Sequence, residues 1–278
     1  MIDGLNIKNK GLLAAKIADA AYASLIEELD TTPKPGLVDK NNCGAHADMD
    51  YALFVLSAKT LRPYFKLMAQ CVESLGQEAS PLLQKLGIEG EREMLKATKG
   101  VNTHRGAIFS LGLFLSGACL AAKENTLPTL SQTLKKVVFY AKNLKRDDQT
   151  EGARLCRAHN IPTAFDYALA GYEEIFSALE IRGNFRPKEG ENIANLRVLL
   201  YYMGAVKDAN AYRRGGAEGA RWLAKEAQKI SQNFSVAHME RLDGECIKRN
   251  ISAGGAADML ALCIFAQKLI DLEIIRKG

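Results

Sequence analysis

The chain has 278 residues, of which 47% are hydrophobic and 25% charged, with 37 Lys and Arg against 32 Asp and Glu. This composition is typical of a globular protein with a sizeable core. The small positive excess, without a dense Lys/Arg block, argues against a nucleic-acid partner and suits an anionic small-molecule substrate.

Helical periodicity dominates the chain from its start, and Ala, Leu, Lys and Glu are plentiful. A first helix has an apolar face from Leu13 to Leu25 and ends near Asp30. A long loop rich in Pro and Gly follows it. A second helix is expected from about Asp48 through Leu61, and Pro63 either interrupts or restarts it.

Seven further helices are expected, and their ranges are Glu89–Thr98, Thr103–Lys123, Leu130–Leu144, Ala164–Leu179, Asn192–Val206, Ala217–Ser231 and Ala256–Ile275. The polar segment from Ile181 to Glu191 is expected to be a loop. No strand set and no repeat of 20–50 residues is evident. We therefore predict an all-α fold, with one multi-helix globular domain over residues 1–278.

The N-terminal residues, the longest apolar run and the cysteines indicate the cellular compartment of the protein. The first ten residues are too polar for a signal peptide. The apolar run from Ala107 to Ala122 falls short of the ~20 residues of a membrane span. The six cysteines are far apart and form no CxxC pair, so reduced thiols are expected. These features indicate a cytoplasmic protein with no membrane partner.

Four polar clusters each stand just before an expected helix, although the common phosphate-loop, dinucleotide and zinc-protease motifs are absent. The clusters are Pro33–Asp39 with Asn42, His46, Asp48 and Asp50; Asn102–Gly106; Asp208–Gly216; and Asn250–Gly255. A helix N-terminus offers free N–H groups, glycines admit an anion closely, and Arg or Lys adds charge. Such loops meeting at one mouth would form a polyphosphate site.

The first cluster suggests a metal. An extended lead-in would bring Asp39, His46 and Asp48 together in preference to Asp50, and such a set suits Mg²⁺. Simpler interpretations stand beside this one. Asp48 is equally well placed to cap the following helix. Thr103 is a good N-cap as well, Arg213 and Arg214 are typical of a solvated pair, and the Gly-Gly doublets suit plain turns.

Four segments of the chain together resemble one known family. They are "TPKPGLVDKNNCGAHADMD", "EMLKATKGVNTHRGAIFSLGL", "VKDANAYRRGG" and "NISAGGAADMLA". They are similar to signature segments of the triphosphoribosyl-dephospho-coenzyme A synthase family, from about Lys10 to Lys268. The resemblance implies an all-helical enzyme that moves the triphosphoribosyl group of ATP to a ribose hydroxyl of 3′-dephospho-coenzyme A and releases adenine.

The same resemblance implies partners. The product would be the precursor of the prosthetic group of citrate lyase or malonate decarboxylase, passed to the transferase that loads the lyase acyl carrier protein. A helical hydrolase that cleaves an N-glycosidic bond with water is the main alternative, because its carboxylates and helix-mouth loops would look alike. A non-catalytic partner of a lyase complex is a third possibility.

We assign hypothetical roles to residues of these segments. Asp39 and Asp48 are candidate catalytic residues, and with His46 and Asp208 they are candidate ligands of an Mg²⁺ ion. His104 is a candidate acid or base. The expected substrate-binding residues are Lys34, Asn102, Arg105, Asn210, Arg214, Gly215, Gly216 and Ser252. Glu93 also matches the family but has a weaker physical claim.

The chain departs from the family pattern at several positions. Arg105 stands where the family usually has Lys, Ala209 replaces Thr, Arg213 replaces His and Ala253 replaces Pro. Around "GARLCRAHNIP" the family commonly carries a Gly-Glu pair where Leu155 and Cys156 stand here. If that Glu is catalytic, these differences bear on activity or substrate choice.

Overall fold

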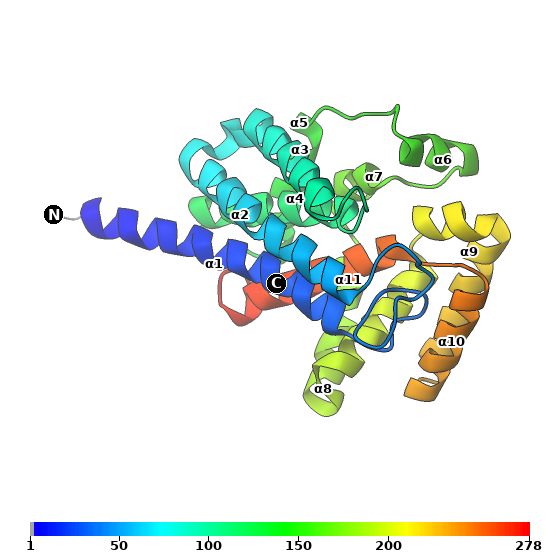
Figure 1. The fold of residues 1–278 in the computed structure, drawn as a ribbon. Coiled ribbons are helices and arrows are strands. Elements are labelled where there is room, and N and C mark those ends of the chain that lie inside the picture. Colours follow the sequence, from blue (N-terminus) through cyan, green and yellow to red (C-terminus); the bar gives the residue numbers. More distant parts are fainter. Residues whose placement is uncertain (1–2) are drawn as a thin grey trace.

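A computed structural model describes the backbone of residues 3–278 and the side chains of residues 11–278, and it is helical throughout (Figure 1). The helices are α1 Asp3–Asp30, α2 Tyr51–Leu75, α3 Ser80–Ala97, α4 Arg105–Glu124, α5 Leu130–Asn143, α6 Glu151–His159, α7 Ala164–Leu169, α8 Ile175–Ala205, α9 Ala209–Gln232, α10 Val236–Lys248 and α11 Gly254–Asp271, with a 3₁₀ turn at Gly76–Ala79. Within this part of the chain there is no strand, so the predicted all-α fold is confirmed.

Helices α4 and α11 form the centre of the molecule. Both are buried along almost their whole length, and they pack on each other with Phe114 edge-on to Phe265. Helix α1 lies along α2 and α11, while α8 covers α11 from another side and pairs with α9 (Figure 1). The α4 helix is long and apolar enough to cross a membrane by composition, but 78% of that window is buried inside the protein. It is therefore the core helix that its sequence predicted.

Several expected boundaries are wrong. The segment Ile181–Glu191 is helical within α8, with a break only at Gly190, where φ is 82°. Most of its polar residues are exposed on the surface of the helix, and the buried one, Arg182, donates to Asn195, Glu27 and Glu191. Pro63 neither ends nor restarts α2, because it lies on an exposed face where water can satisfy the carbonyl that it leaves free.

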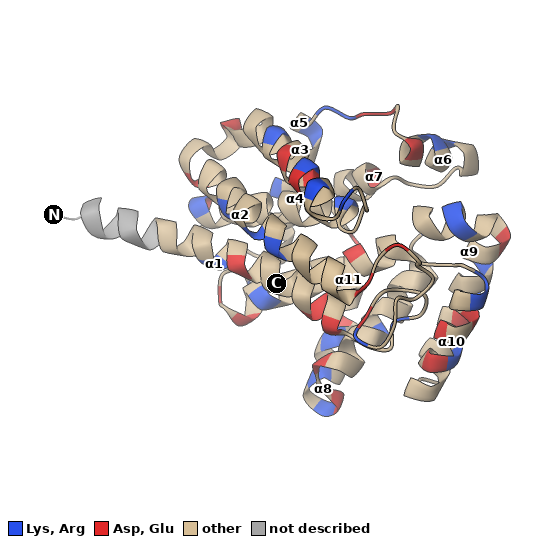
Figure 2. Ribbon diagram, in the orientation of Figure 1, with Lys and Arg blue, Asp and Glu red and all other residues tan. Residues whose placement is uncertain are grey.

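Two helices were not predicted at all, α6 and α10. Both are short and rich in polar residues, so their apolar stripes are narrow. Figure 2 shows charges of both signs mixed along α3 and α8. Many form surface pairs such as Arg197 with Glu189, which stabilise little and leave no sequence signal of their own.

Candidate active site

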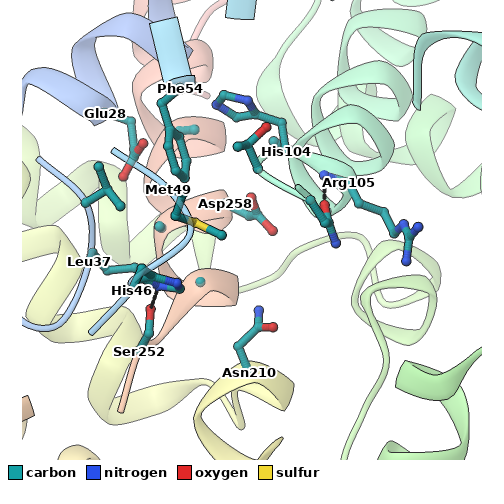
Figure 3. Close-up of a pocket in the computed structure, with 18 of the residues that line it drawn as sticks. Glu28, Leu37, His46, Met49, Phe54, His104, Arg105, Asn210, Ser252 and Asp258 are labelled. Carbon is teal, nitrogen blue, oxygen red and sulfur yellow. Dashed lines mark hydrogen bonds between the residues drawn. The ribbon is translucent and has the colours of Figure 1, made fainter. Parts of the chain in front are cut away.

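A polar cavity of about 220 Å³ lies where the loop after α1 meets the N-termini of α4, α9 and α11 (Figure 3). Its walls hold members of all four polar clusters. Those members are Lys34, His46, Asp48, Asn102, His104, Arg105, Asn210, Arg214 and Ser252. The expected meeting of the clusters at one mouth is thus what the structure shows. Only the structure establishes this meeting, because the first and fourth clusters are at least 200 residues apart in the sequence.

The loop of residues 31–50 is held in place by its own carboxylate, Asp39. Asp39 Oδ2 accepts from Thr32 Oγ1 at 2.8 Å and from Lys34 N at 2.9 Å, and Oδ1 accepts from Asn41 N at 2.7 Å and Asn42 N at 3.2 Å. The side chain is buried and does not line the cavity. Asp39 therefore organises the loop instead of facing a substrate.

The same part of the loop docks on α10 and on the chain before α11. Gly36 N and Asn42 Nδ2 both donate to Asp243, each at 2.8 Å. Gly36 has φ of 69°, and a Cβ there would meet the carbonyl oxygen of Ile251 at 2.2 Å. Only glycine fits at this close approach.

Asp208 also has a structural position. It caps α9 by accepting from Asn210 N at 2.8 Å and Ala211 N at 3.0 Å, and it accepts from Ala256 N in α11 at 2.8 Å. One carboxylate thus ties together two helix N-termini. Burial raises its pKa, while these backbone N–H groups oppose the rise.

The expected metal set does not assemble. Among residues 11–278, no group of three or more His, Cys, Asp or Glu side chains is arranged to hold a metal ion. Asp39 and Asp208 are bonded to backbone, and His46 Nδ1 lies 3.9 Å from Asp48 Oδ1. The convergence of Asp39 with His46 and Asp48 is therefore wrong as geometry, although His46 and Asp48 do share the cavity.

Asp48 is not the N-cap of α2, because Asp50 caps that helix. Asp50 Oδ1 accepts from Leu53 N at 2.8 Å, so Asp50 is the N-cap of α2. Asp48 keeps 63% of its side chain exposed at the cavity edge. The alternative that Asp48 caps the helix is thus wrong.

His104 lies at the start of α4 but its ring is deeply buried. Nδ1 is 2.6 Å from Ser57 Oγ, which accepts from Thr103 Oγ1 at 2.6 Å, and the ring packs edge-on to Phe54. Thr103 is therefore not the N-cap; Asn102 Oδ1 instead accepts from Arg105 N at 3.1 Å. Burial, with the nearby charge of Lys34, lowers the pKa of His104 to about 3.

The low pKa changes what His104 can do. At neutral pH the imidazole is uncharged and has no proton to give as an acid, and it is a weak base. Its Nε2 is buried at the cavity without a hydrogen-bond partner among the described residues, and the same holds for His46 Nδ1. His46 Nε2 contacts Ser252 Oγ at 2.9 Å, and burial lowers its pKa too. Two orphaned ring nitrogens are therefore available to a ligand.

The basic residues fall into two groups. The side chain of Arg105 points away from the cavity (Figure 3). Its Nε donates to Glu91 at 2.6 Å, and the two residues form an ion pair. Arg214 instead reaches across the mouth, where it donates to the carbonyls of Ala45 and Asn250. Lys34 is buried at the cavity in an ion pair with Glu28. Cationic charge therefore faces the cavity from Lys34 and from Arg214.

Among the remaining residues, Gly254 lines the cavity, whereas Gly215, Gly216 and Glu93 do not. Gly215 lies against Ile251, where a Cβ would meet Cγ1 at 2.8 Å, and Gly216 breaks α9 with φ of 65°. Gly254 leaves room for Asn210, whose Nδ2 would be 2.8 Å from a Cβ. Glu93 pairs with Arg92 and Lys96 outside the cavity.

Two acidic residues of the cavity were missed from the sequence. Glu28 comes from the last turn of α1, and Asp258 comes from the second turn of α11. Asp258 stands in the fourth segment quoted above, so position relative to the Gly-Gly doublet was an available signal. Glu28 offered none, because it looks like any charged residue near a helix end.

Comparisons with known proteins address the chain as a whole. A family model described as "ATP:dephospho-CoA triphosphoribosyl transferase" matches residues 14–276. The chain belongs to this family. Proteins named "Probable 2-(5''-triphosphoribosyl)-3'-dephosphocoenzyme-A synthase" from Pseudomonas syringae pv. syringae and Stutzerimonas stutzeri are each 34% identical, with 92% of both chains covered. The namesake from Azotobacter vinelandii is 33% identical over the same share.

Membership of the triphosphoribosyl transferase family makes the chain an enzyme of the transferase class. No solved structure matches the chain. The match of the family model extends past all four polar clusters and ends after α11, so each wall of the cavity falls within the family's own region.

Proposed function

We propose that the cavity transfers the 5-triphosphoribosyl group of ATP to a ribose hydroxyl of 3′-dephospho-coenzyme A and releases adenine. The observation that carries the proposal is the meeting of α4, α9 and α11 N-termini around one cavity. The N-terminus of α4, with Lys34 and Arg214, attracts a polyanion, whereas Asp208 already binds N–H groups at the N-termini of α9 and α11. The acyl carrier of citrate lyase or malonate decarboxylase would be the destination, through the transferase that loads it in the cytoplasm.

Mg²⁺ enters this proposal as part of the substrate. The chain builds no three-ligand site within its described side chains, but Mg²⁺ in nucleotide enzymes commonly needs only one or two carboxylates besides the phosphates. Asp48 is the exposed carboxylate at the mouth that fits this need. Asp39 and Asp208 do not, since their oxygens are bonded to backbone N–H groups.

The neutral imidazoles are assigned to binding. His104 Nε2 and His46 Nδ1 would hydrogen-bond the ribose or phosphate oxygens, and Asn210 and Ser252 lie on the same wall. Filling an orphaned buried nitrogen removes its desolvation cost, so each contact would favour the bound state.

Product analysis tests the proposal. The protein is incubated with MgATP and 3′-dephospho-coenzyme A, adenine is quantified by chromatography and the adduct is sought by mass spectrometry. We expect adenine and adduct in equal amounts, and no adenine when the acceptor is omitted. Adenine with free triphosphoribose would instead support the hydrolase, and no adenine at all would overturn both. An Arg214→Ala variant should lose ATP affinity, whereas Arg241→Ala, on exposed α10, is the matched control.

A further inference from the structure

We propose that Asp258 is the general acid that protonates the adenine as it leaves. This inference rests on the proposed function, because it assigns a residue to the departure of the base. No role for Asp258 follows from the sequence analysis or from the comparisons.

Asp258 projects into the middle of the cavity from α11 (Figure 3). It lies against Gly106 in the first turn of α4, where a Cβ would meet Asp258 Oδ2 at 1.9 Å. The absence of a side chain at Gly106 lets the Asp258 carboxyl group approach the mouth of α4. Any side chain at this position would displace the carboxyl group. This close fit fixes the carboxyl group on the cavity wall.

The lack of hydrogen-bond partners distinguishes Asp258 from the buried acids of the molecule. Asp39, Asp208 and Asp243 each accept at least two hydrogen bonds, and Glu28 accepts from Lys34. No hydrogen bond or ion pair joins Asp258 to any described side chain or backbone group. Asp258 is half-buried in the cavity wall, and a carboxyl group that is partly removed from water without a cation or donor favours its protonated form.

The surrounding charges act in the same direction. Desolvation in the cavity wall is the largest cause that raises the pKa of Asp258 well above its usual range. The charges of Glu28, from α1, and Asp208, from the start of α9, raise it further. Tyr172, before α8, has a buried hydroxyl without a partner, and burial and the Asp258 charge raise its pKa. These surroundings therefore favour the protonated form of Asp258.

The other cavity groups are poor donors of that proton. Burial lowers the pKa of His104 to about 3 and lowers that of His46 as well. Lys34 donates to Glu28, and Asp48 is largely exposed. A protonated carboxyl group is thus the acid that the site offers, the pattern that glycoside-cleaving enzymes also use.

The step balances as follows. The bond between C1′ and adenine N9 breaks, and its electron pair stays on N9. The Asp258 proton passes to a ring nitrogen of the base, and neutral adenine leaves. The acceptor hydroxyl oxygen bonds to C1′ and loses its proton, which returns to the Asp258 carboxylate through solvent before the next turnover. No oxidant or other reactant is needed.

The test compares two leaving groups in Asp258→Asn. With ATP, we expect adenine release to fall about 10²–10⁴-fold, the range of general acid catalysis. With N7-methylated ATP the base is already cationic and needs no proton, so the variant should stay within about tenfold of the wild type. Removal of the acid should also abolish the decline of the wild-type rate at high pH. Asp19→Asn, an exposed carboxylate on α1, is the matched control.

The possible results distinguish a failure of the acid role of Asp258 from a failure of the proposed function. An equal loss with both substrates, or an unchanged rate with ATP, overturns the acid role of Asp258. ATP affinity measured by calorimetry and the melting temperature check that Asp258→Asn folds and binds. A second variant, Gly106→Ala, leaves Asp258 intact but displaces it, and should slow ATP turnover more than that of the methylated analogue. Wild-type protein that releases no adenine overturns the proposed function and this inference together.

Discussion

Asp39 and Asp258 are acids of Gly-rich segments, the first buried and the second half-buried, yet the structure uses them in opposite ways. Four donors surround Asp39, whereas Asp258 has none and faces the cavity. Asp208 belongs with Asp39, because three backbone N–H groups bind it. Backbone N–H groups therefore separate Asp39 and Asp208, which hold the fold, from Asp258, which is free for chemistry.

Removal of Asp208 should have the largest effect on folding. Asp208→Ala deletes the α9 cap and leaves the Ala256 N–H buried, so we expect a loss of about 2–4 kcal/mol in the free energy of unfolding. Urea denaturation measures it. Asp208→Asn keeps one acceptor oxygen and should lose less than half as much. An Ala variant as stable as the wild type would contradict the structural role.

Asp39→Ala should rank second. Four donors lose their acceptor, but Asn41 and the neighbouring backbone are near solvent, so water replaces part of the loss and about 1–3 kcal/mol is expected. The same denaturation measures it, with Asp147→Ala on an exposed loop as control. A large fall in activity with unchanged stability would return Asp39 to the catalytic group.

Sequence reasoning located the loops but not the use of each acid in them. Helix periodicity was sufficient for α4 and α11, because buried helices carry long apolar runs. It failed for α6 and α10, whose polar faces are wide, and at Ile181–Glu191, where the buried Arg182 resembles a surface charge. Tertiary partners decide such cases, and a sequence does not contain them directly.

The roles of the acidic residues in the site also depend on tertiary contacts that the sequence does not contain directly. Asp48 and Asp50 are equivalent as sequence, and only the helix geometry shows that Asp50 is the cap. Asp258 was overlooked because it lies inside a helix, away from the loops where chemistry is expected. Its role becomes visible only when Gly106, about 150 residues earlier, is found against it.

The pH dependence of stability isolates His104. Its pKa is about 3 in the folded protein and about 6.5 in the unfolded chain, so the unfolded state takes up a proton first on acidification. This contribution to stability is complete above pH 6.5 and is lost as the pH falls towards 3. Between pH 7 and pH 5.5 we expect the free energy of unfolding of the wild type to fall by about 1 kcal/mol because of His104. His104→Gln should lack this loss, whereas His159→Gln, at an exposed site, should retain it.

Asp48→Asn should have the smallest effect on folding and so tests the comparison from its other side. With 63% of its side chain exposed and no hydrogen bond to the backbone, Asp48 should change the free energy of unfolding by less than about 0.5 kcal/mol. If it contacts the metal of MgATP, the KM for MgATP should rise roughly 3- to 10-fold, because one charged ligand of several is weakened. Steady-state kinetics at several Mg²⁺ concentrations measures this. A stability loss as large as that of Asp39→Ala would place Asp48 among the acids that hold the fold, and the distinction between the two groups would fail at this residue.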